Sequence, residues 1–139
     1  MTKIGFDVHG VLDTFPVFKQ MMDTFIADPN YEVHVITGLS RADADKDIGH
    51  LVDFDKVKYM SIVDRLTDQG VPFEWINGMP YADANLWNRE KAIYCEEQGI
   101  AIMFDDSPVY GEYFDDIDTI FCQIKNPVRP IFDVRSPSE

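Results

Sequence analysis

The sequence predicts an α/β fold: a three-layer, Rossmann-like core around a central, mainly parallel sheet of about five strands. Short apolar segments alternate along the chain with longer segments of helical periodicity. Some of the apolar runs are continuous, as expected for strands that helices cover on both faces. Several of these runs end in polar or acidic residues. In a parallel sheet such ends lie along one edge, where α/β folds bind their ligands.

Strands are expected where a short apolar or β-branched run stops at a turn-forming or acidic residue. In chain order these runs are Ile4–Phe6, Glu32–Ile36, Pro72–Ile76, Ile100–Phe104 and Thr119–Ile124. Asp7 ends the first run and Gly10 follows it, while Asn77 and Gly78 form a turn after the third. The fourth run leads directly into the pair Asp105-Asp106.

Helices are expected where apolar residues recur every three or four positions. The predicted helices are Phe15–Ala27, Asp55–Gln69 and Arg89–Gln98, with one helical turn at Tyr110–Phe114. Gly70 and Gly99 are placed to end the second and third helices. The polar, Asp-rich segment Ser40–Gly49 is expected to be a loop with one helical turn.

Length and composition predict one domain. The chain has 139 residues, of which 45% are hydrophobic, enough for a single globular core. We expect this core over residues 1–125 and a Pro-rich tail over residues 126–139. Neither a secretory signal nor a membrane-spanning run is expected, so a cytoplasmic location is predicted. Cys95 and Cys122 lack metal-ligand spacing and are expected to be free thiols.

The net charge of −13 restricts the possible partners. It argues against direct binding of nucleic acid or an anionic membrane, because such binding relies on Lys and Arg that neutralise phosphates. A small anionic substrate remains compatible with this charge, since a divalent cation screens carboxylates from a phosphate ester.

Polar residues at the ends of four predicted strands form the candidate site. They are Asp7 with His9, Thr37, Asn77, and Asp105 with Asp106. Three carboxylates at one edge repel one another unless a cation lies between them, and an oxygen-only ligand set suits Mg²⁺. Lys91, at the predicted start of a helix, lies 14 residues before Asp105. Its charge and the helix N-terminus are together suited to hold a phosphate.

The order of these residues resembles the four motifs of the haloacid dehalogenase (HAD) superfamily. Asp7 stands in D-V-H-G-V-L, Thr37 in V-I-T-G, and Asp105-Asp106 in I-M-F-D-D-S, with Lys91 between the last two. The resemblance covers about Lys3–Ile124, and the motif spacing is similar to that of small phosphatases and nucleotidase-like members. It implies a Mg²⁺-dependent hydrolase, most simply a phosphatase acting on a phosphorylated small molecule or macromolecule.

The resemblance also implies a role for each matched residue. Asp7 would attack phosphorus and form an aspartyl-phosphate. Thr37, followed by Gly38, would bind the phosphoryl oxygens, and Lys91 would neutralise them. The implied Mg²⁺ ligands are the carboxylates of Asp7, Asp105 and Asp106 and the backbone carbonyl of His9.

The chain departs from the family pattern at His9. Phosphatases of the family carry a second aspartate at this position, which protonates the leaving group and then activates water. Histidine exchanges protons near neutral pH and is a candidate for the same role. The alternatives are a structural or ligand-contacting imidazole, and a catalytically degenerate protein that binds metal or phosphate in a regulatory or structural role. Other family members that differ at this position perform dehalogenation or phosphonate cleavage.

Two arginines have two interpretations each. Arg41 is a candidate contact for a substrate anion, with a solvated charge as the alternative. Arg89 competes with Lys91 for the position facing the phosphate.

The surroundings of the site are also open to two interpretations. Trp75, Tyr81 and Trp87 either form a stacking wall for a base or belong to the core. Cap domains of this superfamily are inserted after the first motif or between the second and third motifs. The first interval is too short for a cap domain, and the second holds only the helix and strand that complete the core. We therefore expect no substantial cap and an open site, which suits bulky substrates or a partner subunit.

Overall fold

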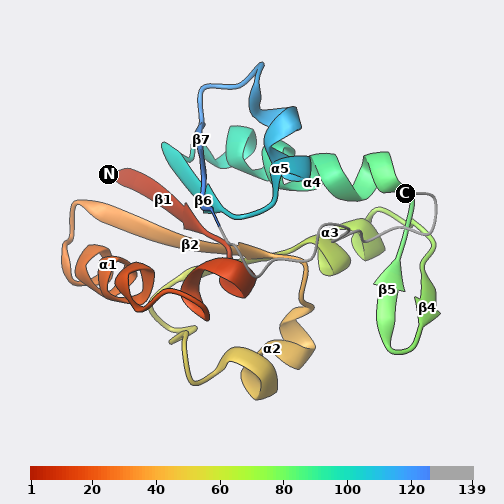
Figure 1. Ribbon diagram of the computed structural model, residues 1–139, viewed down its shortest axis with the longest axis horizontal. Helices are drawn as coiled ribbons and strands as arrows, with labels where there is room; N and C mark the ends of the chain where they lie inside the picture. The colour runs from red at the N-terminus through yellow and green to blue at the C-terminus, as the bar shows by residue number, and fades with distance from the viewer. Residues whose placement is uncertain (126–139) are drawn as a thin grey trace.

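The computed structural model describes residues 1–125, so the predicted tail, 126–139, lies outside the described residues. A five-stranded, all-parallel sheet lies between two layers of helices (Figure 1), with strand order β3-β2-β1-β6-β7. The strands are β1 (Thr2–Phe6), β2 (Tyr31–Thr37), β3 (Lys58–Ser61), β6 (Ile102–Asp105) and β7 (Ile120–Gln123). The predicted three-layer α/β fold is confirmed.

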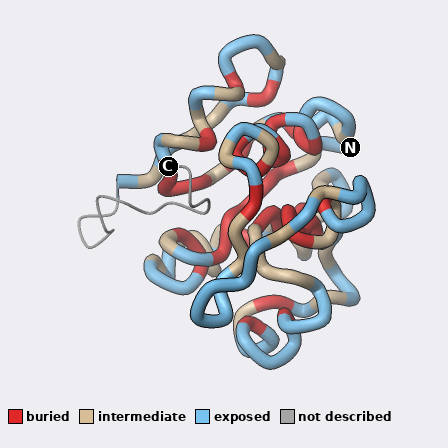
Figure 2. The backbone as a smooth tube through the Cα atoms, turned by 90° about the vertical axis from the view of Figure 1, so that its right-hand side faces the viewer, coloured by how far each residue is buried: buried red, intermediate tan, exposed pale blue. Residues whose placement is uncertain are grey.

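Two groups of helices cover the two faces of the sheet. One face packs against α1 (Pro16–Ala27) and α2 (Arg41–Ile48), and the other against α3 (Ile62–Asp68), α4 (Ala84–Gln98) and α5 (Pro108–Gly111). An irregular turn, η1 (Val8–Leu12), follows β1, and a short turn, η2 (Glu112–Phe114), follows α5. Figure 2 shows buried residues concentrated along the central segments, with exposed residues in the surrounding turns. No helix in the described part of the chain is long and apolar enough to cross a membrane.

The central strand β1 contributes to both cores. Ile4 and Phe6 belong to the core under α1 and α2, where the Phe6 ring stacks on Phe104 with 5.2 Å between centroids. Gly5 faces the other core, and a Cβ there would lie 2.8 Å from Cδ1 of Ile36. The missing side chain lets that core approach the strand closely. A strand buried on both faces explains why the first apolar run of the sequence is continuous.

The segment Ser40–Gly49 was expected to be mainly a loop, and that prediction is wrong. It contains the eight-residue helix α2. Ala44 and Ile48 are one turn apart and both are buried against the core. This apolar pair anchors an otherwise polar helix, because tertiary packing rather than helix propensity stabilises short helices.

The predicted helix Asp55–Gln69 is wrong in its first half. Residues Lys58–Ser61 form β3, which pairs with β2 in parallel, and the helix α3 begins only at Ile62. Ser61 ends the strand and caps the helix, because its hydroxyl accepts a hydrogen bond from the Asp64 amide at 3.0 Å. Pairing with a neighbouring strand has therefore overridden a helical spacing of apolar residues.

The predicted strand Pro72–Ile76 does not join the sheet. Its C-terminal part is β4 (Glu74–Ile76), which pairs in antiparallel with β5 (Met79–Tyr81) in a separate two-stranded hairpin (Figure 1). Asn77 and Gly78 both adopt positive φ, 52° and 76°, at its turn, as two-residue hairpin turns require. Asn77 therefore lies at the tip of a hairpin and not at the edge of the sheet.

Helix α4 begins earlier than predicted, at Ala84 instead of Arg89. The Asp83 side chain accepts a hydrogen bond from the Leu86 amide at 3.0 Å and caps this start. Lys91 consequently lies about two turns inside the helix, and the prediction that it stands at a helix N-terminus is wrong. Cys95 in α4 and Cys122 in β7 are free thiols, as expected.

Candidate active site at the carboxyl edge of the sheet

Three neighbouring strands bring the predicted residues to one edge of the sheet. Thr37 is the last residue of β2, Asp7 follows the last residue of β1, and Asp105 is the last residue of β6. The strands are in parallel register, with Phe6 opposite Val35 on one side and Phe104 on the other. The amide of Asp7 continues this ladder by donating to the Phe104 carbonyl at 2.9 Å. The predicted convergence of these strand ends is what the structure shows.

Three buried carboxylates meet at this edge. Asp7, Asp105 and Asp106 each offer an oxygen, and these oxygens all lie within 4.8 Å of one another. Gly10 in the turn η1 lies directly against this cluster, because a Cβ there would collide with the Asp106 carboxylate. Gly10 also has a φ of 86°, which glycine adopts without steric cost. The absence of a side chain at Gly10 thus leaves room for the Asp106 carboxylate in the cluster.

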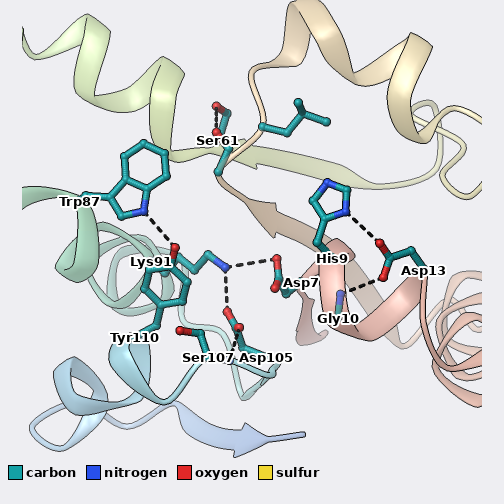
Figure 3. Close-up of polar contacts among 12 residues, drawn as sticks. Asp7, His9, Gly10, Asp13, Ser61, Trp87, Lys91, Asp105, Ser107 and Tyr110 are labelled. Carbon is teal, nitrogen blue, oxygen red and sulfur yellow. Dashed lines mark hydrogen bonds and ion pairs between the residues drawn. The ribbon is translucent and has the colours of Figure 1, made fainter. Parts of the chain in front are cut away.

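Lys91 reaches the cluster from α4 (Figure 3). Its Nζ donates to Oδ2 of Asp105 at 2.7 Å and lies 3.3 Å from Oδ1 of Asp7. The ammonium group also lies 4.3 Å from the centroid of the Tyr110 ring. The Tyr110 hydroxyl is itself fixed, since the Trp87 indole donates to it at 2.9 Å. The buried cation is therefore held in one position by carboxylates and an aromatic ring.

Burial and mutual repulsion perturb the ionisation of this cluster. The pKa of Asp7 is raised well above its ordinary 3.8, first by burial and then by the nearby Asp105 charge, although Lys91 opposes this shift. Burial alone would lower the pKa of Lys91, but the charges of Asp105 and Asp7 raise it above its ordinary value. The cluster thus holds three acidic groups and one ammonium group, all of them buried.

The cluster fits a hard divalent cation. Its donors are carboxylate oxygens only, they are buried, and their spacing lets one ion contact all three. Such oxygen sets are typical of Mg²⁺, Ca²⁺ or Mn²⁺ and unlike the thiolate and imidazole sets preferred by zinc or copper. A cation at this point would also offset the repulsion that raises the pKa of Asp7.

His9 lies on the turn η1 and is oriented by Asp13 (Figure 3). Its Nδ1 lies 2.9 Å from Oδ2 of Asp13, while the other carboxylate oxygen accepts from the Gly10 amide and the Thr14 hydroxyl, each at 2.8 Å. Burial would raise the pKa of Asp13, but these hydrogen bonds, led by that of His9, lower it below its ordinary value. Asp13 was not assigned to the site from the sequence, because the irregular backbone at His9 and Gly10 brings it to the imidazole.

A pocket of about 270 Å³ opens beside Thr37 and His9. Gly38, directly after Thr37, lies against the indole of Trp87, and a Cβ at Gly38 would come within 2.9 Å of that ring. The β4–β5 hairpin contributes Trp75, Met79 and neighbouring residues to the other wall. Thr37 and Gly38, which end the strand next to β1, thus line this pocket.

Two of the predicted cations are not brought to the site. The guanidinium of Arg41 lies 3.9 Å from the centroid of the Phe54 ring and 3.3 Å from Asp45, where it lines a different depression of the surface. Arg89 is exposed on α4, two residues before the buried Lys91. Lys91, and not Arg89, is therefore the cation beside Asp7.

Tyr110 and Ser107 were not singled out from the sequence. Tyr110 places its ring beside Lys91, and the amide of Ser107 donates to Oδ1 of Asp105 at 3.0 Å. Both follow the Asp105-Asp106 pair within a few residues, in a segment predicted only to contain a helical turn. The available sequence signal was the helical turn predicted shortly after the acidic pair. To form such a turn, the chain has to fold back over the end of β6.

No protein-family model, curated protein or solved structure matches the chain. The α/β fold alone does not identify an activity, because one fold supports many unrelated reactions. The function is therefore inferred from the chemistry and geometry of the residues at the sheet edge.

Proposed function

We propose that the chain is a Mg²⁺-dependent phosphohydrolase of the HAD type that cleaves phosphate monoesters through an aspartyl-phosphate on Asp7. The observation that supports this most strongly is the arrangement around Asp7: a buried ammonium group 3.3 Å away and two further carboxylates within 4.8 Å. Phosphoryl transfer needs mainly a positioned nucleophile and neutralisation of the phosphoryl charge. Asp7 would be this nucleophile, and Lys91 together with a bound divalent cation would neutralise the charge.

Asp7, Asp105, Asp106 and the backbone carbonyl of His9 would hold the metal. When bound, Mg²⁺ neutralises charge on the phosphoryl oxygens and favours the ionised form of the neighbouring carboxylates. The protein itself already fixes the three carboxylates on rigid strand ends. Preorganisation of this kind is what a metal site requires from its scaffold.

In the first half of the proposed reaction, a carboxylate oxygen of Asp7 attacks phosphorus. The bond between phosphorus and the ester oxygen breaks, and its electron pair leaves with the alcohol oxygen. Thr37 and Lys91 hold the transferring phosphoryl group, Thr37 through its hydroxyl and Lys91 through its charge. The ammonium group has three donors, so it keeps its bond to Asp105 while it contacts the substrate.

His9 supplies the proton transfers. The lowered pKa of Asp13 favours its ionised form, so the carboxylate accepts a hydrogen bond from Nδ1–H of His9. The remaining nitrogen, Nε2, gives a proton to the departing alcohol and takes one from the water that hydrolyses the aspartyl-phosphate. Attack of this water on phosphorus releases inorganic phosphate and restores the Asp7 carboxylate.

The test is Asp7-dependent phosphate release. Purified protein is incubated with Mg²⁺ and a panel of phosphate monoesters, with Asp7→Asn as the control, and phosphate is measured. Release by the wild type that the variant lacks supports the proposal. The absence of such release on every substrate overturns it. Retained Mg²⁺ binding in calorimetry would then favour a degenerate, regulatory HAD-like protein.

A further inference from the structure

We propose that the pocket between the β4–β5 hairpin and α2 binds the leaving group of the substrate, and that it accepts a flat aromatic group without negative charge. This inference rests on the proposed phosphohydrolase function and adds the substrate class to it. It assigns a role to the hairpin that lies outside the main sheet (Figure 1).

The pocket shares two residues with the candidate active site. His9 and Thr37 line it on one side, and the hairpin lines it on the other. A group bound there would therefore lie beside His9 and Thr37, the residues that the proposed reaction places around the leaving alcohol and the phosphoryl group. The volume of about 270 Å³ lies near the lower end of small-molecule pockets, which begin at about 300 Å³. It suits a ring-sized group and not a folded protein.

The apolar part of this pocket comes from the hairpin and α4. Trp75 and Met79 line it, yet they remain 58% and 41% exposed to solvent. The buried Trp87 lies on the α4 side. Exposed large apolar side chains that gather at a concave surface commonly mark a binding site. Because indole rings stack on flat groups, an aromatic leaving group matches this lining.

Aromatic contacts hold the hairpin in place. The ring of Phe73 lies 6.1 Å from that of Trp75 and 6.3 Å from that of Trp87, measured between centroids. Trp75 is thus linked through Phe73 to the helix that carries Lys91. This chain of rings gives the exposed indole a defined position relative to the carboxylate cluster.

The charge of the lining selects against anions. Asp43 and Asp47, both exposed on α2, line the pocket, and no lysine or arginine among residues 1–125 does so. Arg41 points elsewhere, over the Phe54 ring. A second negative group on the leaving alcohol would face two carboxylates without a cation. Neutral and cationic aromatic groups avoid this repulsion, which is how unfavourable charge pairs produce specificity.

The probes are monoesters that differ in one property at a time. Three share a phenyl phosphate ring with a para two-carbon chain that carries no charged group, an ammonium group or a carboxylate: 4-ethylphenyl phosphate, tyramine O-phosphate and 4-(2-carboxyethyl)phenyl phosphate. Glycerol 3-phosphate has no ring. Adenosine 5′-monophosphate carries a neutral base, so it distinguishes a nucleoside from an aryl alcohol as the source of the ring. The kcat/KM of each ester is measured, and binding to Asp7→Asn is measured by calorimetry with Mg²⁺.

Two variants of the lining are compared with one control variant. Trp75→Ala should lower kcat/KM for the ring-containing esters by up to about tenfold and leave glycerol 3-phosphate unchanged. Ile76→Ala is the matched control, because Ile76 is 39% exposed on the same hairpin but does not line the pocket. The double variant Asp43→Asn with Asp47→Asn should raise kcat/KM for the anionic ester towards that of the neutral one.

The outcomes separate the pocket from the reaction. Ring-dependent binding to Asp7→Asn that Trp75→Ala weakens supports the pocket even if no ester is hydrolysed, a result that overturns only the phosphohydrolase function. Asp7-dependent hydrolysis that is indifferent to the ring, to its charge and to Trp75→Ala overturns the pocket alone. A higher kcat/KM for adenosine 5′-monophosphate than for the aryl esters supports a nucleoside leaving group, and the reverse supports an aryl alcohol.

Discussion

The ammonium group of Lys91 lies 2.7 Å from the carboxylate of Asp105, and neither side chain is more than 1% exposed. Lys91 belongs to helix α4 and Asp105 to β6, the next strand along the chain, so this ion pair joins the helix layer to the sheet. It also orders the site, because the same ammonium group lies 3.3 Å from Asp7. A buried charge that loses its partner is far more costly than an exposed one.

Lys91→Met should therefore destabilise the protein severely. Removing the cation leaves three neighbouring carboxylates buried without compensation, and we expect a loss of about 3–5 kcal/mol in the free energy of unfolding. Urea denaturation in the presence of EDTA measures this loss. Arg89→Met is the matched control on the exposed side of α4 and should change stability by less than about 0.5 kcal/mol. Equal stability of the two variants would contradict the structural role of the ion pair.

Asp7→Asn should change how stability depends on pH. The folded-state pKa of Asp7 is raised above 3.8 by burial and by neighbouring charge. The folded protein therefore keeps a proton that the unfolded chain releases, and the resulting stabilisation is lost as the pH rises through the raised value. Without metal, Asp7→Asn should gain stability relative to the wild type as the pH rises from the ordinary carboxyl pKa of 3.8 towards neutral.

The measurement is denaturant unfolding of both proteins across this pH range in EDTA and in Mg²⁺. Saturating Mg²⁺ should diminish or reverse the difference, because the ion favours the ionised carboxylate only in the wild type. A stability difference that stays constant with pH in EDTA would refute the expected ionisation of Asp7.

Changes at His9 and Asp13 should slow turnover more than they weaken substrate binding. His9→Ala should lower kcat by roughly 10²–10⁴-fold, the usual contribution of general acid–base catalysis. Asp13→Asn should lower it on the order of tenfold by releasing the imidazole. His9→Asp should also lower the rate, because the new carboxylate would face Asp13. Steady-state kinetics over pH measures these effects.

The exposed ion pair Lys19–Asp23 offers a control for the pair of His9 and Asp13, since it has the same four-residue spacing at 2.7 Å. Asp23→Asn should leave kcat unchanged. A rate increase in His9→Asp would indicate that His9 is a degenerate acid–base group and would contradict the adapted role proposed for it.

Gly10→Ala should impair metal binding. Its φ of 86° costs a non-glycine residue about 1–2 kcal/mol, and its Cβ would also collide with the Asp106 carboxylate. We expect Mg²⁺ affinity to fall on the order of 10–100-fold, as for other residues that support metal ligands. Calorimetric titration measures this change.

Gly78→Ala controls for the conformational part of that effect. Gly78 has a similar φ of 76°, but a Cβ there meets nothing within 4 Å. This variant should lose a comparable amount of stability and keep its affinity for Mg²⁺. If both variants bind the ion equally well, the contact between Gly10 and Asp106 has no influence on the metal site.

The convergence of Asp7, Thr37 and Asp105 could be predicted because each follows a buried, continuous strand. Short strands and helices were harder to distinguish. Met60 and Leu66 fit one helical stripe, yet Met60 lies in β3, opposite Ile36. Only the neighbouring strand, which local sequence does not reveal, decides between the two conformations.

The surroundings of the site were predicted less well than its centre. The hairpin replaced a predicted core strand because its three-residue strands are partly exposed and pair only with each other. The contact between His9 and Asp13 depends on the irregular backbone at Gly10, which periodicity does not describe. The residues whose positions depend on turns are accordingly the ones whose contacts the sequence pattern did not predict.

The position of β1 in the sheet has a consequence for folding. Ile4 pairs with Val33 on one side and with Ile102 on the other, so the central strand is completed by a segment near the opposite end of the described chain. Contacts between residues so distant in sequence form slowly, because a long loop has to close first. During synthesis Asp7, which follows β1, remains apart from Asp105 and Asp106 until β6 has been made. A fragment that ends before β6 should therefore lack both the ordered central strand and the acidic cluster.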